Sequence, residues 1–362
     1  MKAAVFPGPN QPLAVEEVDV QPPQKGEVLV KIAGSGLCAS DLHFIQGIFP
    51  WPAPSVLGHE AAGVVEEIGE DVTLVQRGDH VVLAVTPSCG VCRYCAAGKP
   101  YLCSSAGGSH MMKDGTSRLT LRKNSQPLFH FLGVSSFAEY AVASEISVVK
   151  VRDDAPLVSL STVGCAVVTG IGAVLNTARV TPGKSVAVFG CGGVGLNVVQ
   201  GANLVGAWPI IAVDTLDGKL ALAKQFGATH LVNSTKEHPV LKVHEITGGG
   251  ADFTFDAVGD VEVLGQAFDS LDRGGTAVMV GLPGLGAKYA VDTFSLYNDK
   301  RLQGCAYGSV NFRHDVPMIV DLYMAGKIKL DELISRTFAI EDINDAFEAM
   351  RRGEVARAVV TF

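Results

Sequence analysis

Hydrophobic and polar positions alternate with a period of two through the first part of the chain. Such runs occupy residues 13–20, 27–32, 62–69 and 78–83, and later residues 137–142 and 146–151. A period of two indicates strands that bury one face. Proline and glycine punctuate the runs, which is typical of turns between strands. We therefore predict a β-rich body that resembles a barrel, with polar loops between its strands.

The pattern changes after residue 169, where short apolar runs alternate with stretches of helical spacing. Strands are predicted at residues 185–189, 209–213, 252–256 and 276–280, and helices at 196–205, 220–226 and 261–271. Short, nearly all-apolar runs are typical of parallel strands covered on both faces. Strand and helix in alternation predict an open, doubly wound parallel sheet. Beyond residue 307, a helix at 318–324 and a strand at 356–362 are expected to return to the first body.

A glycine-rich loop joins the first of these parallel strands to its helix. It reads Gly190-Cys191-Gly192-Gly193-Val194-Gly195, and Asp214 ends the next strand. Glycines at this spacing let backbone N–H groups approach a pyrophosphate at a helix N-terminus, while the acid accepts hydrogen bonds from the adenosine ribose. Because a carboxylate at Asp214 repels a 2′-phosphate, we predict NAD rather than NADP. Lys219 is expected beside the same ribose.

Four cysteines fall within fifteen residues, at Cys89, Cys92, Cys95 and Cys103. A redox pair and a nucleic-acid-binding zinc module are the alternatives to a structural zinc site. Four thiolates close together satisfy a tetrahedral zinc ion completely, so we predict a structural zinc in the lobe 89–103. The polar, glycine- and serine-rich residues 104–130 that follow are predicted to be a surface excursion.

Cys38, His59 and Cys165 form a second candidate metal site. Two thiols and an imidazole leave a zinc ion one open position, as catalytic zinc sites require. Taken alone, such residues are more often buried thiols and core histidines. The neighbouring residues favour the metal: Ser40 and His43 can pass a proton, and Asp41 can orient a ligand histidine.

Composition narrows the class of protein. The chain has 362 residues, of which 48% are hydrophobic and 18% charged, which suits two folded domains. Its formal net charge of -8 argues against a nucleic-acid partner. Pro7 interrupts the N-terminus before a signal peptide could form, and no apolar run is long enough to span a membrane. We therefore expect a cytoplasmic protein with its eight cysteines reduced.

Together these motifs resemble the zinc-dependent medium-chain alcohol dehydrogenases, over essentially the whole chain. The matching segments are Gly36-x-Cys38-x-Ser40-Asp41-x-His43, Gly58-His59-Glu60, the four-cysteine lobe, Gly164-Cys165, the glycine-rich loop and Asp214. The resemblance implies an α/β protein in which a GroES-like, β-rich catalytic domain comprises residues 1–166 and 307–362. It implies a Rossmann domain that binds NAD at residues 167–306.

The resemblance also implies roles for single residues. Cys38, His59 and Cys165 would hold the catalytic zinc, with Glu60 as an exchangeable ligand and Asp41 fixing His59. Ser40 and His43 would relay the substrate proton to solvent. The residues expected to contact the cofactor outside the glycine-rich loop are Thr169, Val280 and Arg357. With the structural site, this makes two zinc ions per subunit, and a homodimer is expected, a homotetramer being the alternative.

Matched to the family, the positions that line the substrate pocket are apolar: Phe49, Val85, Phe131, Leu132 and Leu282, with Trp51 nearby. From these we predict reversible oxidation of hydrophobic primary alcohols, whether aliphatic, aromatic or terpenoid, to aldehydes with NAD+. Some of these side chains can instead be core packing. The alternative substrate is a hydroxymethyl adduct of a thiol, although Phe49 and Gly107 stand where relatives of that kind have an acid and a basic anchor. A non-catalytic NAD-binding protein is the second alternative.

One position departs from the family in a way that predicts a measurable effect. Many relatives have an arginine or histidine that pairs with the pyrophosphate where this chain has Ala39. We expect Ala39→Arg to tighten NADH binding about tenfold, since it restores a charge-assisted hydrogen bond. Fluorescence titration of NADH measures the dissociation constant, with Ala39→Gln as an uncharged control. An unchanged constant in Ala39→Arg would contradict the prediction.

Overall fold

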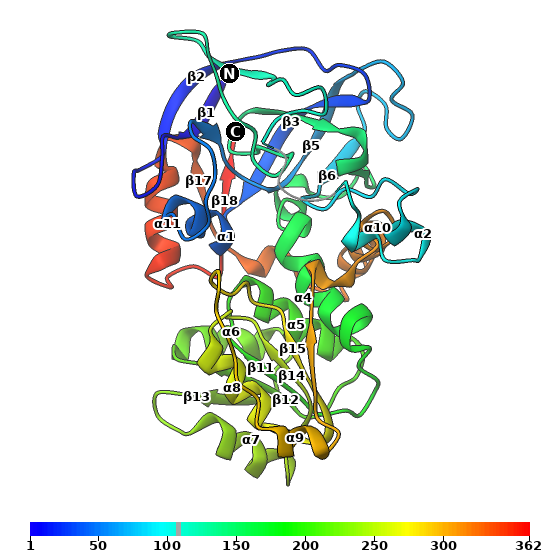
Figure 1. Cartoon of the computed structure of the whole chain (residues 1–362), viewed down its shortest axis with the longest axis vertical. Coiled ribbons are helices and arrows are strands. Elements are labelled where there is room, and N and C mark those ends of the chain that lie inside the picture. Colours follow the sequence, from blue (N-terminus) through cyan, green and yellow to red (C-terminus); the bar gives the residue numbers. More distant parts are fainter. Residues whose placement is uncertain (106–109) are drawn as a thin grey trace. The chain divides into compact units, whose positions relative to one another are not determined.

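The computed structural model describes residues 1–105 and 110–362, so Gly107 lies outside the described residues. The chain forms two compact units (Figure 1). The first consists of Met1–Cys165 together with Asn311–Phe362, and the second of Ala166–Val310. Each unit is described by itself.

The first unit contains an antiparallel sheet in the order β4-β1-β2-β7-β8. Its strands are β1 (Lys2–Phe6), β2 (Ala14–Val20), β4 (Ser55–Val56), β7 (Leu119–Leu121) and β8 (Gln126–Pro127). Strand β1 is buried on both faces, because Ala3 and Val5 pack into one core while Ala4 and Phe6 pack into another. Strands β7 and β8 lie in the segment predicted as a surface excursion. That prediction is wrong for Leu119, whose side chain is buried in the core.

A second sheet in this unit follows the order β10-β6-β5-β3-β18-β17, and β9 also pairs with β3. Its strands are β3 (Glu27–Gly36), β5 (Glu60–Ile68), β6 (His80–Leu83), β9 (Tyr140–Ser144), β10 (Val148–Lys150), β17 (Ile334–Ala339) and β18 (Arg357–Thr361). Val28, Val30 and Ile32 alternate along β3 into one core. The period of two in the sequence therefore arises because alternate residues of these strands face the core, as predicted.

Short and medium helices complete the first unit. They are α1 (Ala39–Ile45), α2 (Arg93–Ala96), α3 (Leu157–Leu160), α10 (Phe312–Met324) and α11 (Ile343–Arg351). In α11, Ile343, Ala346 and Phe347 lie on one helical face and are buried. The ring of Phe347 meets that of Phe137 edge to face, with 5.9 Å between centroids. The last part of the chain thus packs into the core built by the first part.

The second unit is a parallel sheet with helices on it. The strands follow the order β13-β12-β11-β14-β15-β16, and every neighbouring pair is parallel. They are β11 (Val186–Phe189), β12 (Ile210–Asp214), β13 (His230–Asn233), β14 (Ala251–Asp256), β15 (Leu271–Met279) and β16 (Arg301–Gly304). With β11 in the middle and the order reversing there, this is the doubly wound arrangement. The predicted fold class is confirmed.

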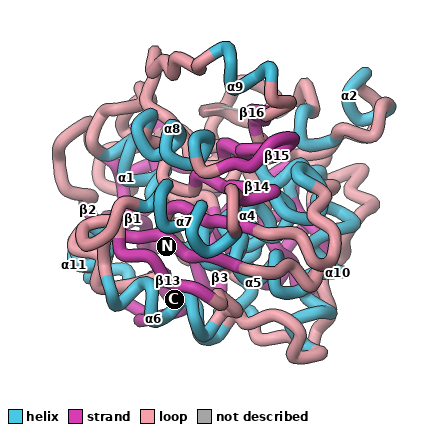
Figure 2. Tube along the Cα trace, turned by 90° about the horizontal axis from the view of Figure 1, so that it is seen from below, coloured by secondary structure: helices cyan, strands magenta, loops and turns pink. Residues whose placement is uncertain are grey.

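Helices connect and cover these strands. They are α4 (Val168–Gly172), α5 (Gly193–Leu204), α6 (Asp217–Gln225), α7 (Pro239–Thr247), α8 (Val261–Asp269) and α9 (Thr293–Tyr297). Helix α5 contacts β11, β12 and β14, and α8 contacts β14, β15 and the neighbouring helix α7. Figure 2 shows β14 and β15 next to each other among these helices. Ala187 and Phe189 of β11 are fully buried, as expected for a strand covered on both faces.

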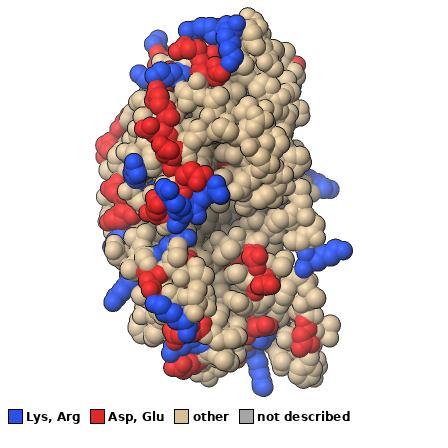
Figure 3. All heavy atoms as spheres, turned by 90° about the vertical axis from the view of Figure 1, so that its left-hand side faces the viewer, with Lys and Arg blue, Asp and Glu red and all other residues tan. Residues whose placement is uncertain are grey.

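Charged side chains of both signs are interspersed on the face of the molecule in Figure 3. Pairs such as Arg122 with Glu17 and Asp19 bring opposite charges within 2.8 Å. Neighbouring charges of opposite sign offset each other's fields. Separately, none of the helices in residues 1–105 and 110–362 combines the length and apolarity needed to cross a membrane.

Candidate catalytic metal centre and cofactor loop

The register between β3, β5 and β18 positions the residues of the candidate metal site in the first unit. Gly36, the last residue of β3, is paired with Glu60 at the start of β5, and on its other side with Val359 of β18. A Cβ atom at position 36 would lie 2.7 Å from Glu60 Oε2 and 3.1 Å from Arg357 Nη2. Only glycine fits there without displacing those two side chains. The chain then leaves β3 and presents Cys38 close to His59.

Four donor side chains converge at this point. One ligand atom each of Cys38, His59, Glu60 and Cys165 lies within 4.8 Å of the others. Cys38 stands directly before α1, and His59 and Glu60 stand at the start of β5. Cys165 lies in a π-helical turn, where Gly164 packs closely against Leu83. The structure thus brings together the three residues predicted as zinc ligands and the exchangeable fourth.

The donor set fits a zinc ion. Two thiols and an imidazole are soft and borderline ligands of the kind that zinc takes in catalytic sites. The pKa of Cys38 is held well below its usual value, chiefly by the hydrogen bond from the Cys165 thiol. In addition, Glu60 Oε1 is buried and has no hydrogen-bond partner in the described part of the chain. A buried carboxylate oxygen without a donor suits a neighbouring cation.

Asp41 holds His59 from the side away from the thiols. His59 Nδ1 lies 2.8 Å from Asp41 Oδ1, and the backbone N–H of Cys38 donates to Asp41 Oδ2 at 3.1 Å. All three groups are buried. With the Nδ1 proton assigned to the carboxylate hydrogen bond, Nε2 keeps its lone pair for a metal. The geometry therefore agrees with the orienting role predicted for Asp41.

Glu60 also forms a buried ion pair with Arg357, the first residue of β18. Burial raises the pKa of Glu60 to about 8, although the Arg357 guanidinium acts in the opposite direction. Arg357 Nε is buried and has no partner among residues 1–105 and 110–362. The guanidinium therefore retains donor capacity beyond its bond to Glu60. The sequence motifs predict a separate role for each residue but not their pairing, because 297 positions separate them.

The predicted proton relay and part of the predicted pocket lie around α1. Ser40 and His43 are half-buried residues of α1, and His43 packs on Phe49 with 5.6 Å between ring centroids. Phe131 is fully buried and lies 5.9 Å from the His59 ring. Trp51 packs edge to face on Phe131 at 5.1 Å. Of these rings, Phe131 therefore borders the donor cluster through His59, whereas Phe49 packs on His43 of α1.

The other three predicted pocket positions are placed differently. Val85 packs against the core that Val28 and Val81 share, and Leu132 packs against the core of Phe131. Leu282 belongs to the second unit, where it is 48% exposed in the segment after β15. The structure thus places Phe131 against His59 and Phe49 against His43, and Leu282 belongs to the other unit.

The four-cysteine lobe forms a second cluster. One sulfur atom from each of Cys89, Cys92, Cys95 and Cys103 lies within 4.8 Å of the others. Backbone N–H groups point at these sulfurs, for example that of Cys95 at Cys92 Sγ. Hydrogen bonds from Cys95 and Ser104 lower the pKa of Cys92 to about 5. Each of the eight cysteines is a free thiol, so this cluster can supply four ligands to one zinc ion.

The glycine-rich loop in the second unit has the shape that a pyrophosphate requires. Gly190 has φ of +92°, and a Cβ on Gly195 would lie 1.8 Å from Gly190 O, so both must be glycine. A Cβ on Gly192 would meet nothing within 4 Å, which leaves open space in front of the α5 N-terminus. Backbone N–H groups at such a helix start bind phosphate oxygens. The loop therefore fits NAD.

A hydrogen bond joins the Asp214 side chain to this loop. Its Oδ2 accepts the backbone N–H of Cys191 at 2.7 Å, and its Oδ1 accepts that of Leu216 at 3.0 Å. The first of these bonds was not foreseen, because Cys191 was assigned no role. Among the other predicted cofactor contacts, Val194 is the second residue of α5, Lys219 lies on α6, Thr169 on α4 and Val280 just after β15. Arg357 alone lies in the first unit.

Comparisons with known proteins identify both halves of the chain. Residues 24–153 match the model of the alcohol dehydrogenase GroES-like domain, and residues 193–325 match that of zinc-binding dehydrogenases. The S-(hydroxymethyl)glutathione dehydrogenase of Paracoccus denitrificans is 43% identical, and that of Photobacterium damsela subsp. piscicida 44%. Each alignment covers all of this chain and 99% of the relative. The crystal structure of benzyl alcohol dehydrogenase from Acinetobacter calcoaceticus superposes on this chain with a TM-score of 0.94, and the two sequences are 37% identical. The superposition covers 100% of this chain and 99% of the benzyl alcohol dehydrogenase chain.

These findings confirm the predicted family, enzyme class and cofactors but correct the predicted substrate. Hydrophobic primary alcohols were the expectation, whereas the full-length curated relatives carry the name that belongs to the thiol-adduct alternative. The expectation was wrong because it rested on apolar side chains alone. An apolar side chain beside the reacting carbon suits either substrate equally well, so it does not discriminate between them.

Replacing Asp41 tests the donor cluster. In Asp41→Asn the charge that fixes His59 is lost, so we expect zinc affinity at this site to fall by about tenfold to a hundredfold. Elemental analysis after dialysis against a chelator should then find the zinc of the four-cysteine lobe but less of the other. Asp19→Asn, an exposed partner of Arg122, is the matched control. Equal zinc retention in Asp41→Asn and the control would contradict the expected role.

Proposed function

The chain belongs to the zinc-dependent medium-chain alcohol dehydrogenase family, and we propose that it oxidises the hydroxymethyl adduct of a thiol, with S-(hydroxymethyl)glutathione as the reference substrate. As an enzyme of this class it acts on CH–OH groups with zinc and NAD. The observation that carries the proposal is full-length identity of 42% to 44% with several enzymes of that name. The cluster of Cys38, His59 and Cys165 supplies the place where the reaction would occur.

We assign residues to the two cofactors as follows. Cys38, His59 and Cys165 hold the catalytic zinc, and Glu60 lies next to it as an exchangeable ligand. The four cysteines of the lobe 89–103 hold the structural zinc. The glycine-rich loop and Asp214 bind NAD in the second unit, which is the cofactor domain. When bound, zinc supplies a Lewis acid for the substrate oxygen, and NAD+ accepts the two electrons of the C–H bond.

The protein's own groups then have three tasks. Asp41 keeps His59 in one orientation through the 2.8 Å contact to Nδ1. Ser40 takes the hydroxyl proton of the substrate, and His43 passes it to solvent. The aromatic ring of Phe131 keeps water from the reacting carbon, because it packs on His59, and Phe49 covers His43.

The reaction balances with the substrate, NAD+ and the proton relay of Ser40 and His43. The substrate R–S–CH2–OH loses two electrons and two protons and becomes the thioester R–S–CHO. A bound NAD+ would supply the acceptor for both electrons and one of these protons. The second proton leaves through Ser40 and His43. In the reverse direction, the same groups return a proton to the oxygen.

Steady-state assays of NADH formation test the substrate. The panel contains glutathione mixed with formaldehyde, formaldehyde alone, benzyl alcohol, hexanol and geraniol. We expect the highest kcat/KM with the thiol adduct and no turnover of formaldehyde without thiol. A higher kcat/KM for benzyl alcohol than for the adduct would contradict the proposal. Ser40→Ala should lower kcat about a hundredfold, which would tie the measured activity to this site.

We further propose that the enzyme is a homodimer formed through the second unit. All four residues of the edge strand β16 are exposed, and Phe294 and Tyr297 of the preceding helix are 69% and 83% exposed. An exposed sheet edge with apolar side chains favours pairing with a second copy.

We also propose that the enzyme is cytoplasmic, because its eight cysteines form no disulfide bonds. Cell fractionation tests this location.

Light scattering after size-exclusion chromatography measures the assembly. We expect the mass of two chains for the native protein and of one chain for Leu302→Lys, which puts a charge into β16. Leu241→Lys is the matched control, because Leu241 is 68% exposed on α7. A dimer that persists in Leu302→Lys, or a native monomer, would contradict the proposed interface.

A further inference from the structure

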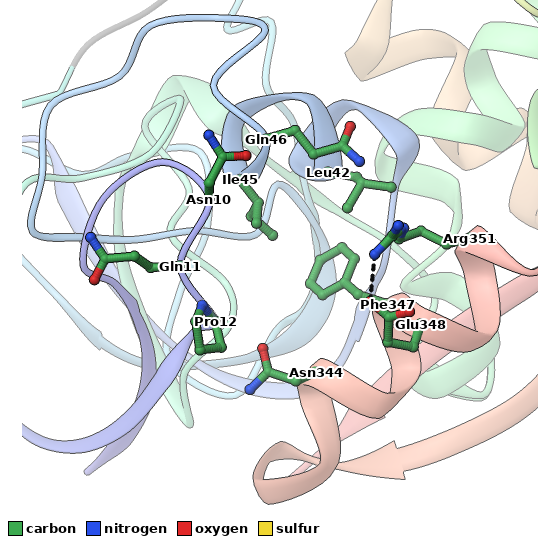
Figure 4. A pocket seen from close by; sticks show the side chains of 10 residues that line it. All are labelled: Asn10, Gln11, Pro12, Leu42, Ile45, Gln46, Asn344, Phe347, Glu348 and Arg351. Carbon is green, nitrogen blue, oxygen red and sulfur yellow. Dashed lines mark hydrogen bonds and ion pairs between the residues drawn. The ribbon is translucent and has the colours of Figure 1, made fainter.

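A pocket of about 390 Å3 lies in the first unit, and none of its lining residues is assigned to zinc, NAD or substrate (Figure 4). One wall is the loop of Asn10, Gln11 and Pro12. The other two walls are the C-terminal part of α1 and one side of α11. The volume is at the lower end of the range for small-molecule sites.

The floor of this pocket is apolar. Phe347 of α11 is 4% exposed, and Leu42 and Ile45 of α1 pack against the same core. In Figure 4, the side chains of Ile45 and Phe347 lie between the loop and α11. An apolar group of a ligand would lose its water here without displacing any hydrogen-bonded group.

Hydrogen bonds hold the walls in place without a ligand. Asn344 of α11 accepts the backbone N–H of Leu13 at 3.0 Å and donates to Leu13 O at 2.9 Å. The backbone N–H of Asn10 donates to Ile45 O at 2.7 Å. The loop is thereby tied to both helices. A site that is formed in advance binds small ligands with less loss of conformational freedom.

The rim carries one charge of each sign. Glu348 and Arg351 are one turn apart on α11, with 2.7 Å between Oε1 and Nη1. Their side chains are 51% and 52% exposed, so their mutual attraction is weak and can be exchanged for that of a ligand. The side-chain amides of Asn10 and Gln46 form no hydrogen bonds with the described residues and can pair with an amide or a carboxylate.

We propose that this pocket binds a zwitterion with an apolar side chain, namely a free apolar amino acid or a dipeptide of that kind. Its carboxylate would pair with Arg351 and its ammonium with Glu348. Its side chain would rest on Ile45 and Phe347, and a peptide bond would meet the amide of Gln46. A simple carboxylate would leave Glu348 unpaired, and a simple amine would leave Arg351 unpaired. The zwitterion is therefore the ligand whose charges match the rim.

An occupant would also contact the helix that serves the donor cluster. Leu42 and Ile45 line the pocket, while Asp41 of the same helix contacts His59. Helix α1 is seven residues long, so both contacts lie within two turns of one rigid element. The pocket therefore shares a wall with the scaffold of the metal centre.

Calorimetric titration of the zinc-loaded enzyme tests the proposal. The ligands are leucine and glycyl-leucine, with 4-methylpentanoate, which lacks the ammonium, and 3-methylbutylamine, which lacks the carboxylate. We expect saturable binding of leucine or the dipeptide and about tenfold weaker binding of each analogue, since each loses one charge-assisted contact. Glu348→Gln and Arg351→Gln should each weaken the native ligand about tenfold for the same reason.

Arg352→Gln and Glu354→Gln are matched controls, because these two exposed residues pair with each other next to the pocket without lining it. Both should bind the ligand as the native protein does. The absence of saturable binding for leucine and the dipeptide would overturn the proposal. Equal affinity for 4-methylpentanoate and leucine would contradict the proposal that the ligand is a zwitterion. Unchanged binding of leucine to both Glu348→Gln and Arg351→Gln would contradict its location in this pocket.

Discussion

The structure of the first unit depends on the absence of a side chain at Gly36. Strand β3 lies between β5 and β18, and Glu60 from one neighbour meets Arg357 from the other in the space that a Cβ at position 36 would fill. This contact fixes the register of all three strands, because a slip by one residue would turn each side chain to the opposite face. The same register sets the start of β5 and the end of β3, and hence the distance between His59 and Cys38. A buried ion pair and a metal centre thus have one geometric origin.

Much of the fold could be predicted because its strong periodic signals are local. The all-apolar β11, the glycine-rich loop and the alternation in β3 appear within a few residues each. Three strands that could not be predicted have weak local signals. Strand β16 is exposed at all its positions, β13 is a short edge strand, and β7 has only Leu119 and Leu121 to bury. Tertiary pairing, rather than propensity, makes these segments strands.

The donor cluster could be anticipated because zinc ligands are chemically distinctive, and the structure brings Cys38, His59 and Cys165 together. The residues that surround the cluster could not be predicted from the sequence. The pairing of Glu60 with Arg357 joins positions 297 residues apart, and no local pattern records it. The substrate was predicted wrongly for a different reason. Apolar lining residues report that a carbon skeleton fits but carry no information on which group is attached to the reacting carbon.

The donor cluster and Phe49, a residue predicted to line the substrate, are held by different parts of the fold, and this has an evolutionary consequence. The donors are fixed by strand register, so the sheet tolerates little change around them. Phe49 instead stands outside the regular strands and helices, where a replacement leaves the sheet untouched. Descendants of one ancestral scaffold can therefore exchange substrates by drift at a few loop positions. The benzyl alcohol dehydrogenase of Acinetobacter calcoaceticus and the S-(hydroxymethyl)glutathione dehydrogenases, all relatives of this chain, illustrate such divergence on a shared framework.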